Sequence, residues 1–194
     1  MIQVRLRVMI ALCVGLGIPA MLAAQQQSTT HPDRTISASP GSNDYGIGVD
    51  ETDKKFMHEA AIGDAAEIEL GHMAQQQASD PQVKSFGRRM VKDHSQADDL
   101  LKDVAASQHV SLPTDLDPKH NDVKQSLSKL SGPAFDRAYM QMMVIEHTQD
   151  VSKFKQEASQ PHDPAVKNFA AQSVPILESH LNEAKQIAAR LKSQ

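Results

Sequence analysis

The chain has 194 residues, a length that suits one domain with a hydrophobic core. Aromatic residues make up 4% of it, Trp is absent, and the formal net charge is -4 with scattered positive charges. This composition disfavours a β-sandwich and a nucleic-acid-binding surface, because strands favour aromatic and β-branched residues and nucleic acids bind clustered basic ones. The one cysteine, Cys13, lies in the N-terminal apolar run. We therefore expect no disulfide, thiolate metal site or cysteine nucleophile in the rest of the chain.

Residues 1–24 have the pattern of a secretory signal peptide. Arg5 and Arg7 give it a positive start, residues 8–18 form an apolar run, and Ala24 ends a small-residue stretch suited to cleavage. The alternative is a membrane anchor, but the run is shorter than the roughly 20 apolar residues that span a bilayer. We therefore expect cleavage near Ala24, export, and no stable membrane span in the mature protein.

Residues 25–50 are rich in Gln, Ser, Thr, Pro, Gly and Asp and show neither helical nor strand periodicity. This composition is typical of a disordered segment, because it offers too little apolar surface to form a core. Two interpretations stay open. The segment is either a flexible leader that holds the domain away from the membrane, or a tail without function.

The remaining residues, 51–192, show repeated signals for the start of an α-helix. Asp-Pro pairs at 80–81, 117–118 and 163–164 place a capping side chain before a proline in the first helical position. Thr52 and Asp53 are expected to open the first helix, and Pro133 to open the third long helix. The expected helices cover residues 53–78, 81–108, 118–132, 133–159 and 164–192. We predict an all-α domain of four long helices with an additional short helix between the second and the third.

The connections indicate how these helices run. Tight turns at 79–80 and 160–163 make the flanking helices antiparallel. The stretch 109–132 is long enough for either a crossover or a decorated hairpin. Pro175 lies inside the last helix and is expected to kink it, because proline cannot donate the helical hydrogen bond.

Each long helix carries one ionisable residue at the centre of its apolar stripe. On the first helix, Phe56, Ala60, Gly63, Leu70, Gly71, Ala74 and Ala78 surround Glu67, and on the second, Val83, Gly87, Met90, Val91, Ala97, Leu101 and Ala105 surround His94. On the third, Met140, Met143, Val144, Val151, Phe154 and Ala158 surround His147, and on the fourth, Phe169, Ser173, Ile176, Leu177, Ala184, Ile187 and Leu191 surround His180. All four residues lie near the middle of their helices, so we expect them in one layer of the core.

This layer has two interpretations. In the first, Glu67, His94, His147 and His180 coordinate a divalent metal such as iron, manganese, zinc or copper, because helical cores build metal sites in this way. In the second, the histidines donate hydrogen bonds to Glu67, and the layer fixes the register of the helices. Met90 and His94 together would offer haem ligands, but no haem attachment motif is present, and neither haem nor a nucleotide is expected.

Further polar residues flank the predicted layer. Asp98, Asp150 and Glu183 follow the three histidines by one helical turn, where they would orient the imidazoles or bind a second metal. The alternative is that they are surface carboxylates paired with nearby lysines. Asp136 and Tyr139 occupy the same stripe as His147. Tyr139 is either a redox-active or hydrogen-bonding residue, or a core residue with its hydroxyl at the rim.

Several segments of the chain resemble a known family. The segments that carry the resemblance are FMHEAAIGDAAEIELGHMA, VKSFGRRMVKDHSQADDLL, LPTDL, FDRAYMQMMVIEHTQDVSKF and VPILESHLNEA. In order and spacing they are similar to the bacterial family called domain of unknown function 4142, over about residues 53–190. The resemblance implies an exported protein with a ferritin-like four-helix bundle, periplasmic or associated with the outer membrane of a Gram-negative-type cell. It implies no activity.

The family's characteristic residues correspond to positions in this chain. Its histidines match His94, His147 and His180, and its Phe-Asp pair and Tyr match Phe135, Asp136 and Tyr139. The chain departs from di-iron members of the ferritin-like superfamily, because it has no Glu-x-x-His motif on its inner faces. Iron storage or ferroxidase activity is therefore not expected by analogy alone.

Three functions are compatible with the sequence. The domain is either a metal-binding protein with a role in metal handling or envelope stress, or a metal-dependent enzyme acting on peroxide or superoxide, or a metal-free structural or interaction module. Convergence of the four side chains favours the first two, and an open coordination position favours the enzyme. The pattern leaves the protein partners open and is compatible with a homo-oligomer.

Overall fold

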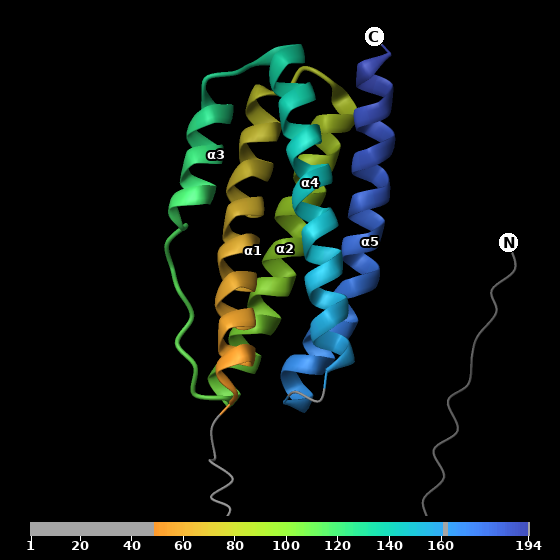
Figure 1. The fold of residues 1–194 in the computed structure, drawn as a ribbon. Coiled ribbons are helices and arrows are strands. Elements are labelled where there is room, and N and C mark those ends of the chain that lie inside the picture. The colour runs from red at the N-terminus through yellow and green to blue at the C-terminus, as the bar shows by residue number, and fades with distance from the viewer. Residues whose placement is uncertain (1–48, 161–162, 194) are drawn as a thin grey trace, which may run out of the picture. The chain divides into compact units, whose positions relative to one another are not determined.

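The structure is a computed structural model that describes residues 49–160 and 163–193 (Figure 1). The predicted signal peptide and nearly all of the predicted leader lie outside the described residues. The helices all lie in the compact unit formed by residues 45–194. None of the described helices is long and apolar enough to cross a membrane.

The described residues contain five α-helices and no strand, which confirms the all-α prediction. The helices are α1 (Glu51–Gln77), α2 (Pro81–Ser107), α3 (Pro118–Ser128), α4 (Gly132–Ser159) and α5 (Pro164–Lys192). Asp80, Asp117 and Asp163 cap α2, α3 and α5 as predicted, each accepting hydrogen bonds from first-turn N–H groups. These side chains satisfy helix-end donors that would otherwise have no partner.

The first helix begins slightly earlier than the sequence indicated. It starts at Glu51, and its cap is Asp50, whose side chain accepts from the N–H of Thr52 at 3.0 Å. Asp53 is buried instead of opening the helix, and its Oδ2 accepts from the N–H of Asp163 at 3.0 Å. This bond holds the start of α1 to the start of α5. Val49, which we placed in the leader, packs against the core.

The directions of the helices show whether the long connection between α2 and α4 is a crossover or a hairpin. In Figure 1, α1 and α5 run in one direction, and α2 and α4 run in the other. The segment after α2 returns along the outside of α1 through α3 before α4 begins. Residues 109–131 therefore form a crossover and not a hairpin. The closest helix pairs are α1 with α2 and α4 with α5, and the two pairs meet along α2–α5 and α1–α4.

The hydrophobic core is divided into two clusters. One contains Leu70, Met90, Met143 and Ala184, among others, and the second contains Ala61, Leu101, Phe154 and Leu177, among others. On every long helix, the predicted ionisable residue lies between a member of the first cluster and a member of the second. A polar layer therefore separates the two apolar parts of the core, as the stripe pattern predicted.

One residue of the predicted apolar stripes is exposed, and several others, including Gly63, are only half-buried. Ile176 was expected to surround His180, but 47% of it is exposed to solvent. It lies on a groove between α2 and α5, described below, where the two helices leave part of the stripe uncovered. Gly63 is only half-buried and has nothing within 4 Å of the position that a Cβ would take. Pro175 lies inside α5, which continues through it to Lys192.

Candidate metal centre

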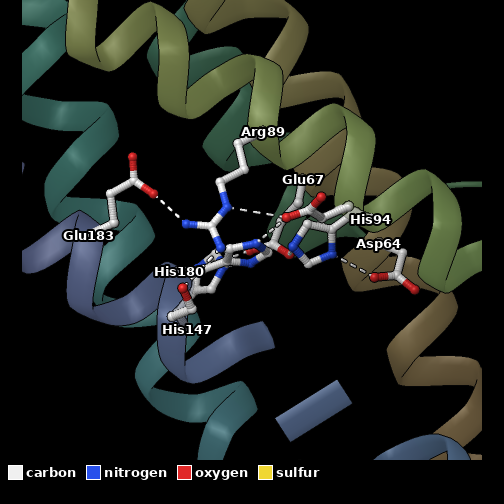
Figure 2. Close-up of polar contacts among 9 residues, drawn as sticks. Asp64, Glu67, Arg89, His94, His147, His180 and Glu183 are labelled. Atoms are coloured by element: carbon white, nitrogen blue, oxygen red, sulfur yellow. Dashed lines mark hydrogen bonds and ion pairs between the residues drawn. The ribbon is translucent and has the colours of Figure 1, made fainter. Parts of the chain in front are cut away.

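The four residues predicted from the helical stripes all lie in the polar layer. Glu67 comes from α1, His94 from α2, His147 from α4 and His180 from α5 (Figure 2). Their exposed fractions are 5%, 3%, 0% and 0%, respectively. Side chains of this kind are costly to bury without hydrogen bonds or a bound ion, so their contacts indicate what the layer can do.

The three histidines form a compact triangle. Their ring centroids are 5.3 Å apart for His147 and His180, 5.4 Å for His94 and His180, and 5.8 Å for His94 and His147. One nitrogen of each ring lies within 4.8 Å of a nitrogen of both others. The closest approach joins His147 Nε2 and His180 Nδ1, which are 3.3 Å apart.

Two of the imidazoles are held from outside by carboxylates. His94 Nδ1 lies 2.7 Å from Asp64 Oδ1, and His180 Nε2 lies 2.9 Å from Asp93 Oδ2. An ionised carboxylate only accepts hydrogen bonds, so each of these outer nitrogens carries a proton. The neutral forms of these rings then have their lone pairs on His94 Nε2 and His180 Nδ1.

The third imidazole is held by the backbone. His147 Nδ1 lies 3.0 Å from the carbonyl oxygen of Met143. A carbonyl oxygen also only accepts, so Nδ1 is the donor and the lone pair of neutral His147 is on Nε2. This is the nitrogen that faces His180 Nδ1. The protons of both rings therefore point outward while two lone pairs face each other across 3.3 Å.

Glu67 lies beside this triangle and contacts two of its members. Its Oε2 is 2.8 Å from His94 Nε2, and its Oε1 is 3.2 Å from His147 Nδ1. Neither His94 Nε2 nor Glu67 Oε1 has a hydrogen bond with acceptable geometry among the described residues. Glu67, His94 and Asp64 form a second group of potential ligands within 4.8 Å of one another. The layer thus consists of two groups that share His94.

The Glu67–His94 pair carries opposite charges in the metal-free protein. Burial opposes ionisation of Glu67, but the attraction of its carboxylate to the protonated forms of His147 and His94 outweighs burial and lowers the pKa of Glu67 to about 2. Burial also disfavours a charged His94, but Glu67 and Asp64 outweigh it and raise the pKa of His94 well above its ordinary value. Glu67 is therefore a carboxylate, and His94 holds an additional proton.

The other two histidines are neutral. Burial lowers the pKa of His147, and the Glu67 carboxylate offsets only part of this effect. Burial lowers the pKa of His180 to about 4, although its hydrogen bond to Asp93 acts in the opposite direction. Neutral imidazole is the form that binds metals, so both rings are ready to act as ligands near neutral pH.

Arg89 extends the support of His180. Its Nε lies 3.2 Å from Asp93 Oδ2, its Nη2 donates to Ser179 Oγ at 2.9 Å, and its Nη1 pairs with Glu183 (Figure 2). The guanidinium therefore links α2 to α5 and holds the carboxylate that orients His180. Glu183, which we expected to flank His180, reaches this network through Arg89.

Two carboxylates of the site, Asp64 and Asp93, were not among the residues predicted from the apolar stripes. Asp64 lies three residues before Glu67, so it occupies the same side of α1, and this spacing was an available signal. Burial raises the pKa of Asp64, although His94 acts in the opposite direction. Asp93 points about 100° away from its neighbour His94, so it lies off the apolar stripe of α2. That direction leads to His180 on the adjacent helix, which sequence periodicity does not reveal.

The remaining flanking residues lie in different surroundings. Asp98 pairs with Lys102 on the solvent side of α2. Asp136 accepts from the N–H groups of Ser79 and Asp80, each at 3.0 Å, so it binds the connection between α1 and α2. Asp150 is half-buried, and burial followed by the Glu67 charge raises its pKa to about 8. The structure brings Asp150 near Glu67 and places Asp98 and Asp136 elsewhere.

Aromatic side chains from α2 and α4 lie next to the layer. Tyr139 is fully buried, stacks on Phe135 and meets Phe86 edge to face. Its hydroxyl has no hydrogen-bond partner among the described residues, and burial raises its pKa well above the ordinary value. Phe86 also lies 6.3 Å from the ring of His147 and 6.5 Å from that of His180. The sequence stripe did not include Phe86.

Two openings reach the layer from opposite sides. A groove of about 850 Å³ runs between α2 and α5, with Leu100, Phe169 and Ile176 along it and with His94 and His180 at its inner end. A smaller cavity of about 210 Å³ lies where α1 and α4 meet beneath α3, and it reaches Glu67. Solvent and small solutes can therefore approach the histidine side and the carboxylate side separately.

The chain was compared with known families, curated proteins and solved structures. No functionally curated protein matches the sequence. Among solved structures, the crystal structure of a DUF305 fragment from Deinococcus radiodurans is similar, with a TM-score of 0.65 and 13% sequence identity, over 74% of this chain and 99% of that chain. At this identity the similarity shows a shared fold and no more. The family model described as "Domain of unknown function (DUF4142)" matches residues 42–187, so the chain belongs to that family.

Proposed function

We propose that this protein is an exported, ferritin-like four-helix bundle that binds one divalent metal ion through His94, His147 and His180, with Glu67 as the adjacent carboxylate. One observation carries the proposal. Two neutral, buried imidazoles direct their lone pairs at each other across 3.3 Å, while their protons are committed to acceptors outside the triangle. Such an arrangement needs a positive partner between the rings.

The distances are suited to a metal ion. Two nitrogens bound at about 2.0–2.1 Å with a tetrahedral angle between them lie about 3.3–3.4 Å apart. The separation of His147 Nε2 and His180 Nδ1 is 3.3 Å. Metal-binding histidines commonly donate their other N–H to a carboxylate or a backbone carbonyl. Asp64, Asp93 and the Met143 carbonyl supply these acceptors here.

Glu67 and His94 supply the rest of the donor set. In the metal-free protein they are an ion pair with a 2.8 Å contact. A cation in the triangle would replace the additional proton of His94 and leave Glu67 close enough to serve as a fourth ligand. A bound ion would stabilise negative charge and could exchange electrons if it is redox-active. The chain's own residues provide the ligands, their orientation and a buried environment.

The donor set narrows the identity of the metal. Imidazoles suit zinc, copper and iron, while manganese prefers more oxygen ligands. We therefore rank zinc, copper and iron above manganese for the three-histidine site. The absence of cysteine outside the N-terminal run argues against metals that require thiolate ligands.

We also propose that the protein acts in the cell envelope. The signal-peptide pattern of residues 1–24 supports export, and the family resemblance supports the envelope of a Gram-negative-type cell. The crossover between α2 and α4 supports the ferritin-like assignment, because bundles of that type have one long crossover. A metal-binding domain in this place would serve metal handling or envelope stress.

The test is the metal content of the purified protein. The chain is prepared without a histidine tag, loaded with zinc, copper or iron, desalted and measured by elemental analysis. We expect about one equivalent of one of these metals, consistent with a three-histidine site. The double variant His94→Ala/His147→Ala should bind none. His72→Ala is the matched control, because His72 is exposed on α1 and should not change the metal content. An empty wild-type protein would reject the proposal and favour a metal-free module.

The groove between α2 and α5 favours a second candidate function. Because it reaches His94 and His180, a small oxidant could approach a metal held there. This supports a redox enzyme acting on peroxide or superoxide. The test is whether the iron- or copper-loaded protein consumes either species faster than the double variant at equal metal concentration. Equal rates would reject the enzyme and leave the binding function intact.

A further inference from the structure

The groove between α2 and α5 has the size and the lining of a site for a small organic molecule. Its volume is about 850 Å³, and small-molecule sites in proteins measure roughly 300–1,000 Å³. Most of its lining is apolar and comes from α2, α4 and α5. The apolar side chains along it include those of Ala97, Leu100, Val104, Phe154, Phe169 and Ile176. An occupant of this groove would therefore be mostly apolar.

Two large apolar side chains at the groove are left exposed by the fold. Of the described residues, Leu100, Ile145 and Ile176 are the large hydrophobic ones that remain exposed, and two of these three lie on the groove. Leu100 comes from α2 and Ile176 from α5, so a molecule between the helices would remove both from water. Scattered apolar residues on a surface need no explanation, whereas a pair on the two walls of one groove favours an apolar ligand.

Aromatic rings lie deeper in the groove. Phe154 and Phe169 are both buried, and their ring centroids are 6.0 Å apart with the planes inclined at 52°. Aromatic pairs favour inclined and edge-to-face arrangements of this kind. A third ring inserted between the helices would continue this packing. The apolar part of the ligand is therefore best matched by an aromatic ring.

The inner end of the groove is polar and offers both an acceptor and donors. Asp64 and Arg89 line the groove beside the histidines (Figure 2). Asp64 Oδ2 has no hydrogen-bond partner among the described residues. Arg89 has five N–H groups, and it uses one each on Asp93, Glu183 and Ser179. A hydroxyl group both donates and accepts, so it suits either kind of partner.

A negatively charged ligand would find no free cation in this groove. The described residues that line it include no lysine, and Arg89 is already paired with Asp93 and Glu183. His94 already contacts two carboxylates. An anion buried without a partner is costly, so the hydroxyl-bearing ligand should be neutral.

We infer that the groove is a binding site for a small neutral phenol. Its aromatic ring packs against Phe154 and Phe169, and its hydroxyl group lies at the polar inner end. Leu100 and Ile176 cover the ring from the two walls. The inference goes beyond the proposed function and does not depend on it, because none of these contacts requires a bound metal. The competing possibility is that the groove holds only water.

Titration with 4-propylphenol tests the inference. The untagged chain is kept metal-free with a chelator, and binding is measured by equilibrium dialysis. We expect saturable binding of one molecule per chain. Two analogues with the same apolar body test the head group. The anionic 4-propylbenzoate should bind at least about tenfold more weakly. The ether 4-propylanisole cannot donate a hydrogen bond and should bind at least about threefold more weakly.

Substitutions along the groove test where the phenol binds. Ala97→Phe places a large side chain in the groove and should weaken binding at least about tenfold, because the interior has no room for both rings. Ile176→Ser removes apolar surface from one wall and should weaken binding at least about threefold. Ile145→Ser is the matched control, because Ile145 is 49% exposed against 47% for Ile176 but does not line the groove. It should bind like the wild type. Circular dichroism of each variant checks that it is folded.

The outcomes separate this site from the metal centre. A wild-type chain that shows no saturable binding of 4-propylphenol below about 1 mM would overturn the inference. Wild-type affinity in both Ala97→Phe and Ile176→Ser would also overturn it, because the phenol would then bind elsewhere. Equal affinities for the phenol and its two analogues would mean unselective adsorption of apolar molecules and would reject the site as well. Selective binding by a chain that takes up no metal would support this site while rejecting the three-histidine site.

Discussion

Helix α2 makes two contacts that differ in how closely the helices approach. Against α1 the backbones almost touch, because Gly71 and Gly87 face each other: a Cβ on Gly71 would lie 2.7 Å from the carbonyl oxygen of Gly87. Against α5 the helices leave a groove of about 850 Å³, with Leu100 and Ile176 exposed along it. One side of α2 is fixed by backbone contact, while the other depends on side chains that cross a gap.

This difference separates two parts of the site. The carboxylate side, Asp64 and Glu67 with His94, is built on the closely packed α1–α2 pair. His180 comes from α5 and is tied to α2 through Asp93 and Arg89. A rigid interface thus positions the carboxylates, and a polar network positions the last histidine. Substitutions on the two sides should therefore have different consequences.

The largest effect is expected where the backbones touch. In Gly87→Ala, the new Cβ would lie 2.7 Å from Ala74 Cβ and 2.8 Å from the Gly71 carbonyl oxygen. Neither atom belongs to a flexible side chain, so α1 and α2 must separate. We expect a loss of about 3 kcal/mol in the free energy of unfolding, measured by urea denaturation.

Gly63→Ala on α1 is the control for this prediction. Nothing lies within 4 Å of its Cβ position, so the substitution meets no obstacle. It should raise the stability by about 0.5–1 kcal/mol, because alanine favours the helix more than glycine does. Similar losses of stability in Gly63→Ala and Gly87→Ala would show that the close contact of α1 with α2 is not the reason why Gly87→Ala destabilises the protein.

The next effect concerns the connection between α1 and α2. Asp136 is buried and accepts from the N–H groups of Ser79 and Asp80 and from the Ser79 hydroxyl. Asp136→Ala would leave these donors without their acceptor, and we expect a loss of about 2 kcal/mol in thermal or urea unfolding. Asp98→Ala, at an exposed ion pair with Lys102, should cost less than about 0.5 kcal/mol. A drop in metal content without a loss of stability would instead assign Asp136 to the metal site.

On the side of α2 that faces the groove to α5, a substitution should change the metal affinity and not the stability of the fold. Asp93→Ala removes the acceptor that orients His180 and the carboxylate that accepts from Arg89 Nε. We expect metal affinity to fall by about 10–100-fold, as for other residues that hold a metal-binding histidine, with a stability change below about 1 kcal/mol. Competition with a chromophoric chelator measures the affinity. Asp99→Ala on the same helix should bind metal like the wild type, and equal affinity in both variants would exclude a role for Asp93.

The helices could be predicted closely because their signals are local. Asp80, Asp117 and Asp163 each precede a proline and cap the helix that follows, and these features depend on adjacent residues alone. The first cap was misplaced because Asp50, Thr52 and Asp53 are all good capping residues within one turn. Sequence alone does not tell which of three suitable neighbours accepts the hydrogen bond.

The site could be predicted only in part, for a geometric reason. Glu67 and the three histidines stood out because each interrupts the apolar stripe of its own helix. Asp93 supports His180 across the α2–α5 groove, and a contact between two helices depends on how far apart they pack. The same groove explains the exposure of Ile176, which periodicity placed in the core. Stripes identify which residues face inward, but not which helices close over them.

The smallest predicted effect lies between α1 and α4, where Asp150 approaches Glu67. Asp150 ionises at its ordinary pKa of 3.8 in the unfolded chain, whereas burial and the Glu67 charge raise its pKa to about 8 in the folded one. Between these values the folded chain keeps a proton that the unfolded chain releases, so this group lowers the stability of the metal-free protein progressively as the pH rises from about 4 to about 8.

Asp150→Asn removes this dependence, so the variant and the wild type should be equally stable at pH 4. At pH 8 the metal-free variant should be more stable by less than about 1 kcal/mol, because Asp150 is half-buried and partly screened by solvent. Urea denaturation at several pH values in the presence of a chelator measures the difference. Equal stability of the two chains at pH 8 would mean that Asp150 ionises in the folded protein as readily as in the unfolded one.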